Sequence, residues 1–316
     1  MKTSRVPIIT VLTCTYDRAW AIPRLYESLL KQESVLFEWV VVDDGSRDDT
    51  GCLINKLKQE SGFQIRYVYQ KNSGKHIAFN RGVSMARGDF VVPLDSDDEL
   101  LPGSLGKLFA SWHNISAKKK ADCAGVLGRC VTANGELFGD KFAEDYFIGD
   151  LRRLRLKDKI KGDFSGFLRA DVLKEFPFPE CGVGRISFFP ERIVFFRIAK
   201  KYNILFLKAG IMTYNHDSPQ EQLTSLPMSR KYEAHRLHAK HMLNENLDCF
   251  FMNPKFFVRE AAYFTRVSLH LKIPTTMTLK GVNGFKARCL VFMSYPIGVI
   301  LFLLDRKRAG CFVRHS

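Results

Sequence analysis

Short apolar runs recur along the first hundred residues, separated by longer segments with helical spacing. Residues 8–14, 37–42, 64–69 and 90–94 are rich in β-branched and aromatic side chains, which is typical of strands. The segments between them repeat apolar residues every three or four positions, as amphipathic helices do. The pattern predicts an α/β fold with a mainly parallel, doubly wound, Rossmann-like sheet, because alternating strands and helices form right-handed crossovers.

Two helix ends in this region carry local signals. Ser46 and Asp49 resemble a capping box before the second helix. Gly88 follows the third helix and suits a left-handed helix end. These signals predict a helix that begins after Ser46 and a helix that ends before Gly88.

The pattern changes after residue 100. Residues 121–170 carry shorter, Gly-rich signals that predict a hairpin and loops. Pro190 suits the first turn of a helix over residues 191–200, and residues 203–207 form another apolar run. We therefore expect one α/β domain over residues 1–225, with halves of about 1–100 and 101–225.

The remainder, residues 226–316, has a mainly helical pattern with breaks at Pro254, Pro274 and residues 281–284. Residues 289–304 form an uncharged run, shorter than the ~18–20 residues that usually span a membrane. Pro296 and Gly298 interrupt the run, and basic residues stand on both sides. The run is either a buried core helix or an interfacial element. The basic flanks favour contact with an anionic membrane surface.

Polar clusters follow three of the four predicted strands. They are Tyr16-Asp17, Asp43-Asp44 and the acidic turn Asp95-Ser96-Asp97-Asp98. The carboxyl ends of parallel strands meet at one edge of a sheet, where ligands bind. Two carboxylates two positions apart, as in Asp95 and Asp97, suit one hard divalent cation. A single such pair is often a solvated turn, but three clusters at one edge favour a binding site.

Charge and cysteine content narrow the functional class. The chain has 48 basic and 33 acidic residues, a net charge of +15, which favours anionic partners. No zinc-finger spacing or aromatic RNA-binding motif accompanies this charge, so nucleic acid is not expected as a partner. The eight cysteines lack C-x-x-C spacing, which fits a reduced cytoplasmic protein.

These motifs together resemble glycosyltransferase family 2, whose members have the GT-A fold. The resemblance is carried by VPIITVLTCTYDRAWAIPRLYESLLKQ, FEWVVVDDGSRDDT and QKNSGKHIAFNRGVSMARGDFVVPLDSDD, and more weakly by GDFSGFLRADVLKEFPFPE and FFPERIVFFRIAKKYNILFL. It implies inverting transfer of a hexosyl or N-acetylhexosaminyl group from a nucleoside-diphosphate sugar, expected to be a UDP-sugar. The implied acceptor is a saccharide or lipid-linked saccharide in cell-surface polysaccharide synthesis.

The resemblance also assigns roles to residues. It implies that Asp44 contacts the nucleotide base, that Asp97 binds Mn²⁺ or Mg²⁺, and that Asp95 lies by the ribose, the donor sugar or the metal. Thr15 and Tyr16, at the end of the first strand, are expected at the donor. A divalent cation on the leaving diphosphate stabilises the charge that develops there.

Several further candidates have an alternative structural role. Lys75 suits the diphosphate or is a solvated helix start, and His76 contacts a substrate or is structural. Asn80 binds the donor or supports its loop by hydrogen bonds. His216 is a candidate metal ligand, although one imidazole alone is weak evidence.

The catalytic base is less certain from the sequence. Inversion needs a group that removes a proton from the acceptor hydroxyl. Many family members carry Glu-Asp at the start of the later helix, but this chain has Glu191-Arg192. Glu191 is therefore the preferred base, although it also suits a helix N-terminus. Asp163 is the alternative base, or it orients the acceptor.

Two other functions remain open at this point. A nucleotidyltransferase also uses carboxylates and Mg²⁺, but it usually has a Gly-rich loop where residues 13–18 lack glycine. A non-catalytic scaffold would explain Arg192. The favoured hypothesis is an inverting transferase, cytoplasmic and peripheral on the inner face of the cell membrane.

Overall fold

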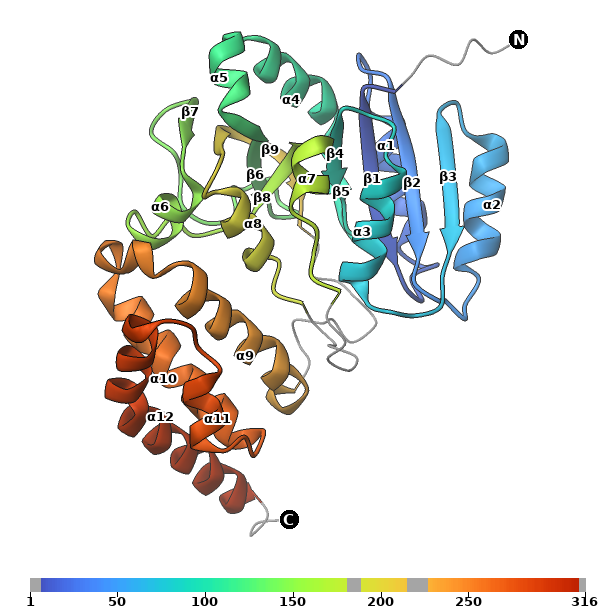
Figure 1. Cartoon of the computed structure of the whole chain (residues 1–316). Coiled ribbons are helices and arrows are strands. Elements are labelled where there is room, and N and C mark those ends of the chain that lie inside the picture. Colours follow the sequence, from blue (N-terminus) through green and yellow to red (C-terminus); the bar gives the residue numbers. More distant parts are fainter. Residues whose placement is uncertain (1–6, 181–188, 215–226, 313–316) are drawn as a thin grey trace. The chain divides into compact units, whose positions relative to one another are not determined.

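The computed structural model describes residues 7–180, 189–214 and 227–312, with backbone alone for residues 308–312 (Figure 1). The chain divides into two compact units. The first contains Met1–Leu154, Ile160–Arg185 and Arg197–Gln220. The second contains Arg155–Lys159, Ile186–Phe196 and Glu221–Ser316. Each unit is described by itself.

The first unit is built on a nine-stranded sheet. Its path order is β3-β2-β1-β4-β8-β6-β9-β5, and β7 pairs with β9 at one side. The strands are β1 (Ile9–Thr15), β2 (Phe37–Asp43), β3 (Gln64–Tyr69), β4 (Phe90–Pro93), β5 (Glu99–Leu100), β6 (Cys123–Val131), β7 (Tyr146–Gly149), β8 (Phe164–Arg169) and β9 (Asn203–Thr213).

The first four strands pair in parallel, as the alternating pattern predicts. β1 lies between β2 and β4, and β3 continues the sheet beyond β2. The second half is mixed: β8 is antiparallel to β4 and β6, β9 is parallel to β6, and the short strands β5 and β7 are antiparallel to β9. The carboxyl ends of β1, β2, β3 and β4 therefore form one continuous edge.

Helices cover both faces of this parallel region, which confirms the doubly wound prediction. On one face, Ile9 and Val11 of β1 pack with the apolar side of α1 (Ile22–Leu30), with α2 (Thr50–Glu60) and with α4 (Ser104–His113). On the other face, Leu12 meets α3 (Lys75–Met85), and a Cβ at Gly82 would clash with its methyl groups. In Figure 1, α3 crosses in front of the sheet.

Three further helices belong to the region after residue 115. They are α5 (Ala117–Ala121), α7 (Ala170–Glu175) and, at the unit boundary, α6 (Leu151–Leu156). The predicted hairpin is present in short form, since β6 ends in a turn and Val131 bridges to Leu137. The predicted helix over 191–200 is the shorter α8 (Arg192–Ile198), with Glu191 in the turn before it.

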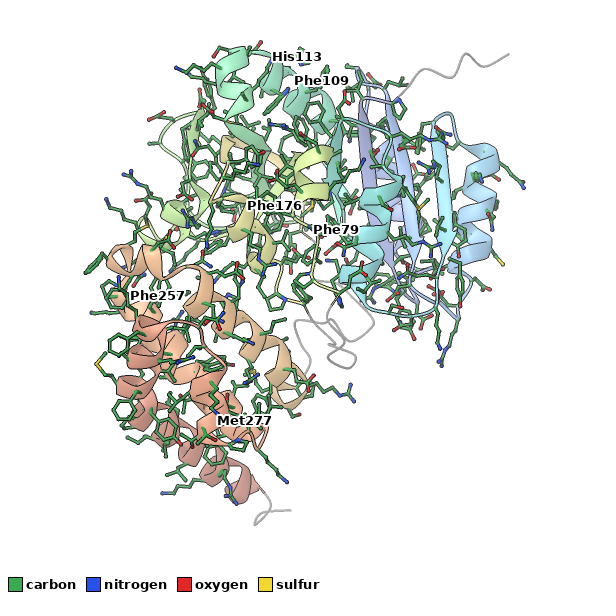
Figure 2. The ribbon with its side chains drawn as sticks, in the orientation of Figure 1. Phe79, Phe109, His113, Phe176, Phe257 and Met277 are labelled. Carbon is green, nitrogen blue, oxygen red and sulfur yellow. The ribbon has the colours of Figure 1, made fainter. Side chains whose placement is uncertain are left out.

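The second unit is helical, as expected. It contains α9 (Met228–Glu245), the 3-10 helix η1 (Leu247–Met252), α10 (Pro254–His270), α11 (Thr275–Lys280) and α12 (Phe285–Phe312). α10 begins at Pro254, and α11 and α12 begin directly after Pro274 and Gly284, at the predicted breaks. Their apolar core includes Phe257, labelled in Figure 2, together with Phe264 and Met242.

One prediction for this unit was wrong. Pro296 and Gly298 do not interrupt the apolar run, because α12 is continuous through both. Pro296 is exposed, and Gly298 permits close approach to α10. A Cβ at Gly298 would lie 2.6 Å from the carbonyl oxygen of Ala262. Among the described residues, one segment, Phe285–Lys307, is long and apolar enough to span a membrane by length and composition.

Six of the cysteines lie among the described residues. Cys14, Cys52, Cys123, Cys130, Cys249 and Cys289 form no disulfide bond with one another. Three of these are buried among apolar residues, where a thiol packs as a small hydrophobic group.

A candidate nucleotide-binding site at the sheet edge

The carboxylate of Asp44 is held by a loop that follows β3. Its Oδ1 accepts hydrogen bonds from the Gln70 side chain and the Ser73 N–H, and its Oδ2 accepts one from the Gly74 N–H, each 2.8 Å long. The Asp44 N–H in turn donates to the carbonyl oxygen of Thr15. This nearly buried carboxylate joins the ends of β1 and β2 to the start of α3.

The carboxylate of the preceding residue, Asp43, is also held by hydrogen bonds from the fold. Its carboxylate accepts hydrogen bonds from the Tyr67 hydroxyl at 2.7 Å and from the Ser46 N–H at 2.8 Å. Gly45, between Asp44 and Ser46, has a φ of +92°, a conformation that glycine adopts without strain. The Asp-Asp-Gly-Ser turn is thus a rigid support for the strand edge.

The loops after β1 and β2 hold each other through reciprocal hydrogen bonds. The Asp17 N–H donates to Ser46 Oγ at 2.9 Å, and the Arg47 N–H donates to Asp17 Oδ1 at 2.6 Å. The expected capping box was wrong, because Ser46 is used in this contact and Asp49 makes no side-chain cap. Asp48 accepts from the Thr50 N–H instead.

The acidic turn after β4 lies beside the N-terminus of α3. The Lys75 ammonium pairs with both carboxylate oxygens of Asp95, at 2.8 and 2.9 Å. Arg24 donates to the backbone carbonyl of Asp97 at 2.7 Å and pairs with Glu99 at 3.1 Å. Lys75, Asp95 and Asp97 are therefore brought to the edge that Asp44 occupies, through the loop leading into α3.

Electrostatics distinguish Asp97 from the other carboxylates. Burial raises the pKa of Asp97, and the neighbouring carboxylate of Asp95 raises it further, while Arg18 and Lys75 oppose the shift. Its charge is therefore incompletely compensated. A cation bound at the turn would relieve this repulsion.

The opposite side of the acidic turn is formed by Tyr214, which sequence reasoning missed. Glu99 pairs with Thr213 across β5 and β9, which places Tyr214 level with Asp98. Its ring stacks on Phe138, with centroids 5.7 Å apart. Burial raises the pKa of the Tyr214 phenol, and the carboxylates of Asp98, Asp163, Asp97 and Asp95 raise it further. The hydroxyl stays protonated within this acidic surround.

Asp163 approaches the same region from β8. It is exposed, and its carbonyl accepts a hydrogen bond from the Cys130 N–H. Next to it, the buried Arg129 guanidinium lies over the rings of Phe142 and Phe164, at 5.1 and 4.8 Å. Arg129 also donates to the carbonyls of Phe138 and Lys161. It thus supports both the Tyr214 side and the Asp163 side.

His76 and Asn80 lie on α3 beside the segment that follows α7. Asn80 donates to the Phe178 carbonyl at 2.8 Å and accepts from the Phe178 N–H at 2.9 Å, which is the loop-supporting role. Phe79, labelled in Figure 2, packs edge-on against Phe178 at 5.3 Å. Burial lowers the pKa of His76, against the opposing carboxylates of Asp44 and Glu180.

A cavity of about 380 Å³ opens beside this segment. Its lining comprises Asn80, Glu175, Arg197 and the run of residues 176–180, including the labelled Phe176 (Figure 2). Glu180 faces both this cavity and His76. The cavity therefore adjoins the α3 side of the candidate site.

The remaining predicted residues come from three parts of the chain. Glu191 belongs to the second unit, where its carbonyl accepts from the N–H groups of Val194 and Phe195 at the start of α8. His216 lies outside the described residues. Thr15 is buried at the end of β1 and Tyr16 is exposed, both at the same edge as Asp44.

The donor set fits a hard cation that takes most of its ligands from a substrate. Within the described ranges, no group of three or more His, Cys, Asp or Glu side chains is placed to hold a metal. Asp95 and Asp97 offer oxygen ligands, and Mg²⁺-type sites use one or two carboxylates with substrate phosphates. The raised pKa of Asp97, caused by burial and by the carboxylate of Asp95, is consistent with that chemistry.

Comparison with known proteins agrees with this geometry. A solved structure of S. aureus TarS residues 1–349 in complex with UDP-GlcNAc is similar in fold, with a TM-score of 0.56. The match covers 91% of this chain and 89% of that one at 20% identity. This likeness confirms the GT-A type of fold.

Curated relatives match shorter regions. The chain is 28% identical over 182 residues to a Campylobacter jejuni protein named GalNAc(5)-diNAcBac-PP-undecaprenol beta-1,3-glucosyltransferase, covering 55% of this chain and 56% of that protein. It is 35% identical over 123 residues to the Rhizobium meliloti succinoglycan biosynthesis protein ExoO, covering 39% and 32%. The chain thus spans about a third to just over half the length of these relatives.

The family comparison covers the whole edge described above. The model of glycosyl transferase family 2 matches residues 10–175, from β1 through the acidic turn to the end of α7. Because this match extends over more than half of the chain, the protein belongs to glycosyl transferase family 2.

Proposed function

We propose that this protein is an inverting glycosyltransferase that uses a nucleoside-diphosphate sugar, with UDP as the nucleotide. The single observation that carries the proposal is the contrast at the strand edge. Asp44 is held rigidly by three donors, whereas Asp97 lies in an incompletely compensated negative field. The fixed carboxylate of Asp44 suits hydrogen bonding to a polar base. The acidic turn at Asp97 attracts a cation and so suits a diphosphate.

The nucleotide end of the ligand is assigned to β1 and β2. Three acceptor positions on the Asp44 carboxylate are used within the described residues, which leaves one of about four for a base N–H. Thr15 Oγ1 is buried and has no hydrogen-bond partner in the part of the chain that the structure describes. Tyr16, exposed beside it, offers a ring for the base. His76, on α3, lies close enough to Asp44 to interact with its carboxylate.

The diphosphate end is assigned to the acidic turn. Asp97, with Asp95, would hold Mn²⁺ or Mg²⁺, which when bound stabilises the charge on the departing diphosphate. The Lys75 ammonium is held by Asp95 in the free protein. When a cation binds Asp95, the Lys75 ammonium can leave that ion pair and donate a hydrogen bond to a phosphate oxygen.

The catalytic base is proposed to be Glu191, with Asp163 as the alternative. Glu191 is exposed at the turn before α8, where its side chain is accessible from solvent. Asp163 is also exposed and lies near the acidic turn through Tyr214. A base contributes ~10²–10⁴-fold to such a reaction.

Donor and acceptor are inferred from the relatives. TarS was solved with UDP-GlcNAc, and the Campylobacter jejuni relative is named for transfer to an undecaprenol-linked glycan. We infer a UDP-hexose or UDP-N-acetylhexosamine donor and a saccharide or lipid-linked acceptor in surface polysaccharide synthesis. The +15 charge favours work at the anionic inner face of the cell membrane.

A thermal-shift screen of nucleotide sugars with and without Mn²⁺ tests the proposal. A ligand at about one hundred times its Kd stabilises the fold by about 2.7 kcal/mol, so the correct donor is expected to raise Tm clearly. Absence of any shift across UDP-, GDP- and CMP-sugars would favour a non-catalytic scaffold. A shift with UTP but none with a UDP-sugar would favour a nucleotidyltransferase.

The base is tested with matched amides in the same donor assay. Glu191→Gln is expected to remove transfer while leaving the donor shift intact, and Asp163→Asn to retain measurable transfer. The reverse result would move the base to Asp163.

A further inference from the structure

We infer that α12 is an in-plane membrane anchor that docks one exposed apolar face on an anionic lipid surface while its other face stays packed on α10. This inference deepens the membrane localisation of the proposed function and rests on it for its biological setting. The residues that support it all belong to the second unit.

The apolar residues of α12 occupy two faces. Toward the bundle, Ala287, Leu290, Val291 and Ser294 are buried, and Gly298 contacts α10. Away from the bundle, Phe285 is 82% exposed, Phe292 70% and Met293 67%, and the exposed face continues through Ile297, Ile300, Leu303 and Leu304. At 100° per residue these exposed positions fall within one arc of the helix.

This exposed face is too regular to be scattered surface hydrophobicity. From Phe292 it recurs on every turn to Leu304, and with Phe285, about two turns earlier, it extends over about 30 Å of helix at 1.5 Å per residue. Met277 of α11, labelled in Figure 2, adds another exposed apolar side chain at 62%. Contiguous apolar surface of this extent marks an interaction site.

Charge selects a lipid surface as the occupant. Lys286 and Arg288 are exposed at one end of the face, and Arg306 and Lys307 at the other. Anionic headgroups would neutralise both ends at once. A second copy of the chain would bring the same basic ends together in either helix orientation, which is repulsive.

The packing of α12 favours an in-plane orientation over a spanning one. Asp305 pairs with Arg266 of α10 at 2.6 and 2.7 Å and with His270 at 2.9 Å. A spanning α12 would either break this ion pair or carry the charges of α10 into the hydrocarbon, and both are costly.

Pro296 points the same way. It cannot supply the hydrogen bond that the carbonyl of Phe292 would otherwise accept. At the interface, water and headgroups reach such a carbonyl directly, whereas a spanning helix needs a neighbouring helix, a Ser or Thr side chain or a local backbone adjustment to satisfy it.

Vesicle sedimentation with the full chain tests the docking face. Wild type is expected to bind vesicles containing phosphatidylglycerol and to bind pure phosphatidylcholine weakly. Phe292→Asp with Ile300→Asp is expected to weaken binding to the anionic vesicles at least about tenfold, because it removes buried apolar contact. The matched control is Leu30→Asp with Leu36→Asp, which changes the charge equally at exposed apolar residues of the first unit and should reduce binding far less.

Depth measurements test the orientation. Phe285, Phe292 and Ile300 are replaced by tryptophan one at a time, and quenching of tryptophan fluorescence by brominated lipids is measured. Trp20, Trp39 and Trp112 remain in every variant and contribute a constant signal. In-plane docking predicts similar, shallow depths at all three sites. A deep minimum at Phe292 with shallow ends would establish a spanning helix and overturn the inference.

Two further results would overturn it. One is equal vesicle binding by wild type and the α12 double variant. The other is a concentration-dependent dimer, seen by analytical ultracentrifugation, that the same double variant dissociates. The donor thermal shift, measured on both proteins, separates this question from the proposed function. Absence of the donor thermal shift in wild type would contradict the proposed enzyme function and leave the anchor untouched. A donor thermal shift that persists in a variant that no longer binds vesicles would support the anchor.

Discussion

The two acidic turns at the edge of the parallel sheet have similar sequences and opposite electrostatics. After β2, Asp43 and Asp44 are buried and receive hydrogen bonds from five donors of the fold. After β4, burial and the neighbouring carboxylate of Asp95 raise the pKa of Asp97, and the Lys75 ammonium is paired with Asp95. The first turn is stable without a ligand, whereas the second gains most from a cation.

This difference separates two roles that the motif alone does not distinguish. A carboxylate whose hydrogen bonds come from the protein fixes the shape of the site and offers a selective hydrogen-bond acceptor. A carboxylate under like-charge repulsion serves charge binding, and it lowers the stability of the free protein in exchange. Substitution should therefore affect stability in opposite directions at the two turns.

The largest effect is expected from Asp97→Asn. Transfer should fall by about 10³-fold or more, because the turn loses the carboxylate proposed to hold the cation. The apo protein should at the same time melt a few degrees higher, since a repelled charge is removed. Enzyme assay and calorimetry on one preparation measure both quantities.

Asp89→Asn is the matched control for that experiment, because it removes an exposed carboxylate at the opposite end of the same strand. It should leave transfer near wild type. A melting temperature lowered equally by both substitutions would contradict the repulsion at Asp97.

Asp44→Asn should act in the opposite direction on stability. Asparagine replaces one carboxylate oxygen by an NH₂ group, which cannot accept a hydrogen bond from the backbone N–H of Ser73 or Gly74. The lost hydrogen bond should lower the free energy of unfolding by about 1–3 kcal/mol. Denaturant unfolding of the apo protein measures this loss. Asp49→Asn in the same turn, where the side chain makes no cap, should be close to neutral; an unchanged stability in Asp44→Asn would show that its hydrogen bonds are not important.

Tyr214→Phe sharpens the boundary of the acidic turn. Loss of the protonated hydroxyl should lower kcat about tenfold or more, as expected for a hydrogen bond to a charged group, with donor KM changed less. Tyr69→Phe removes an exposed hydroxyl at the end of β3 and serves as the control. Equal kinetics for the two variants would exclude Tyr214 from the site.

The smallest effect is a pH dependence. An acid whose pKa is raised in the folded state binds more protons folded than unfolded, so stability falls as pH rises from the ordinary value near 3.8 through the raised pKa. The stability advantage of Asp97→Asn over wild type should therefore grow across that window and then level off. Denaturant titrations at a series of pH values would detect it, and a constant difference would refute the shift.

Periodicity in the sequence predicted the elements that rest on local pattern. The four parallel strands, their helices and the carboxylates at the strand ends follow from apolar spacing and from the geometry of parallel sheets. Family resemblance then supplied the proposed roles of Asp44 and Asp97, which no spacing rule provides.

What escaped the sequence depends on contacts between distant segments. Tyr214 reaches the acidic turn only through the antiparallel register of β5 and β9, more than one hundred residues apart. Asn80 meets Phe178 across a comparable separation. The continuity of α12 through Pro296 was missed because packing on α10 outweighs the local preference to break.

The central claim is that the turn after β4 needs a cation to bind a diphosphate. Isothermal titration of UDP into wild type and Asp97→Asn, each with and without Mn²⁺, tests it directly. The account predicts that Mn²⁺ tightens UDP binding to wild type at least about tenfold and leaves Asp97→Asn unchanged. Equal UDP affinity in all four titrations would contradict it.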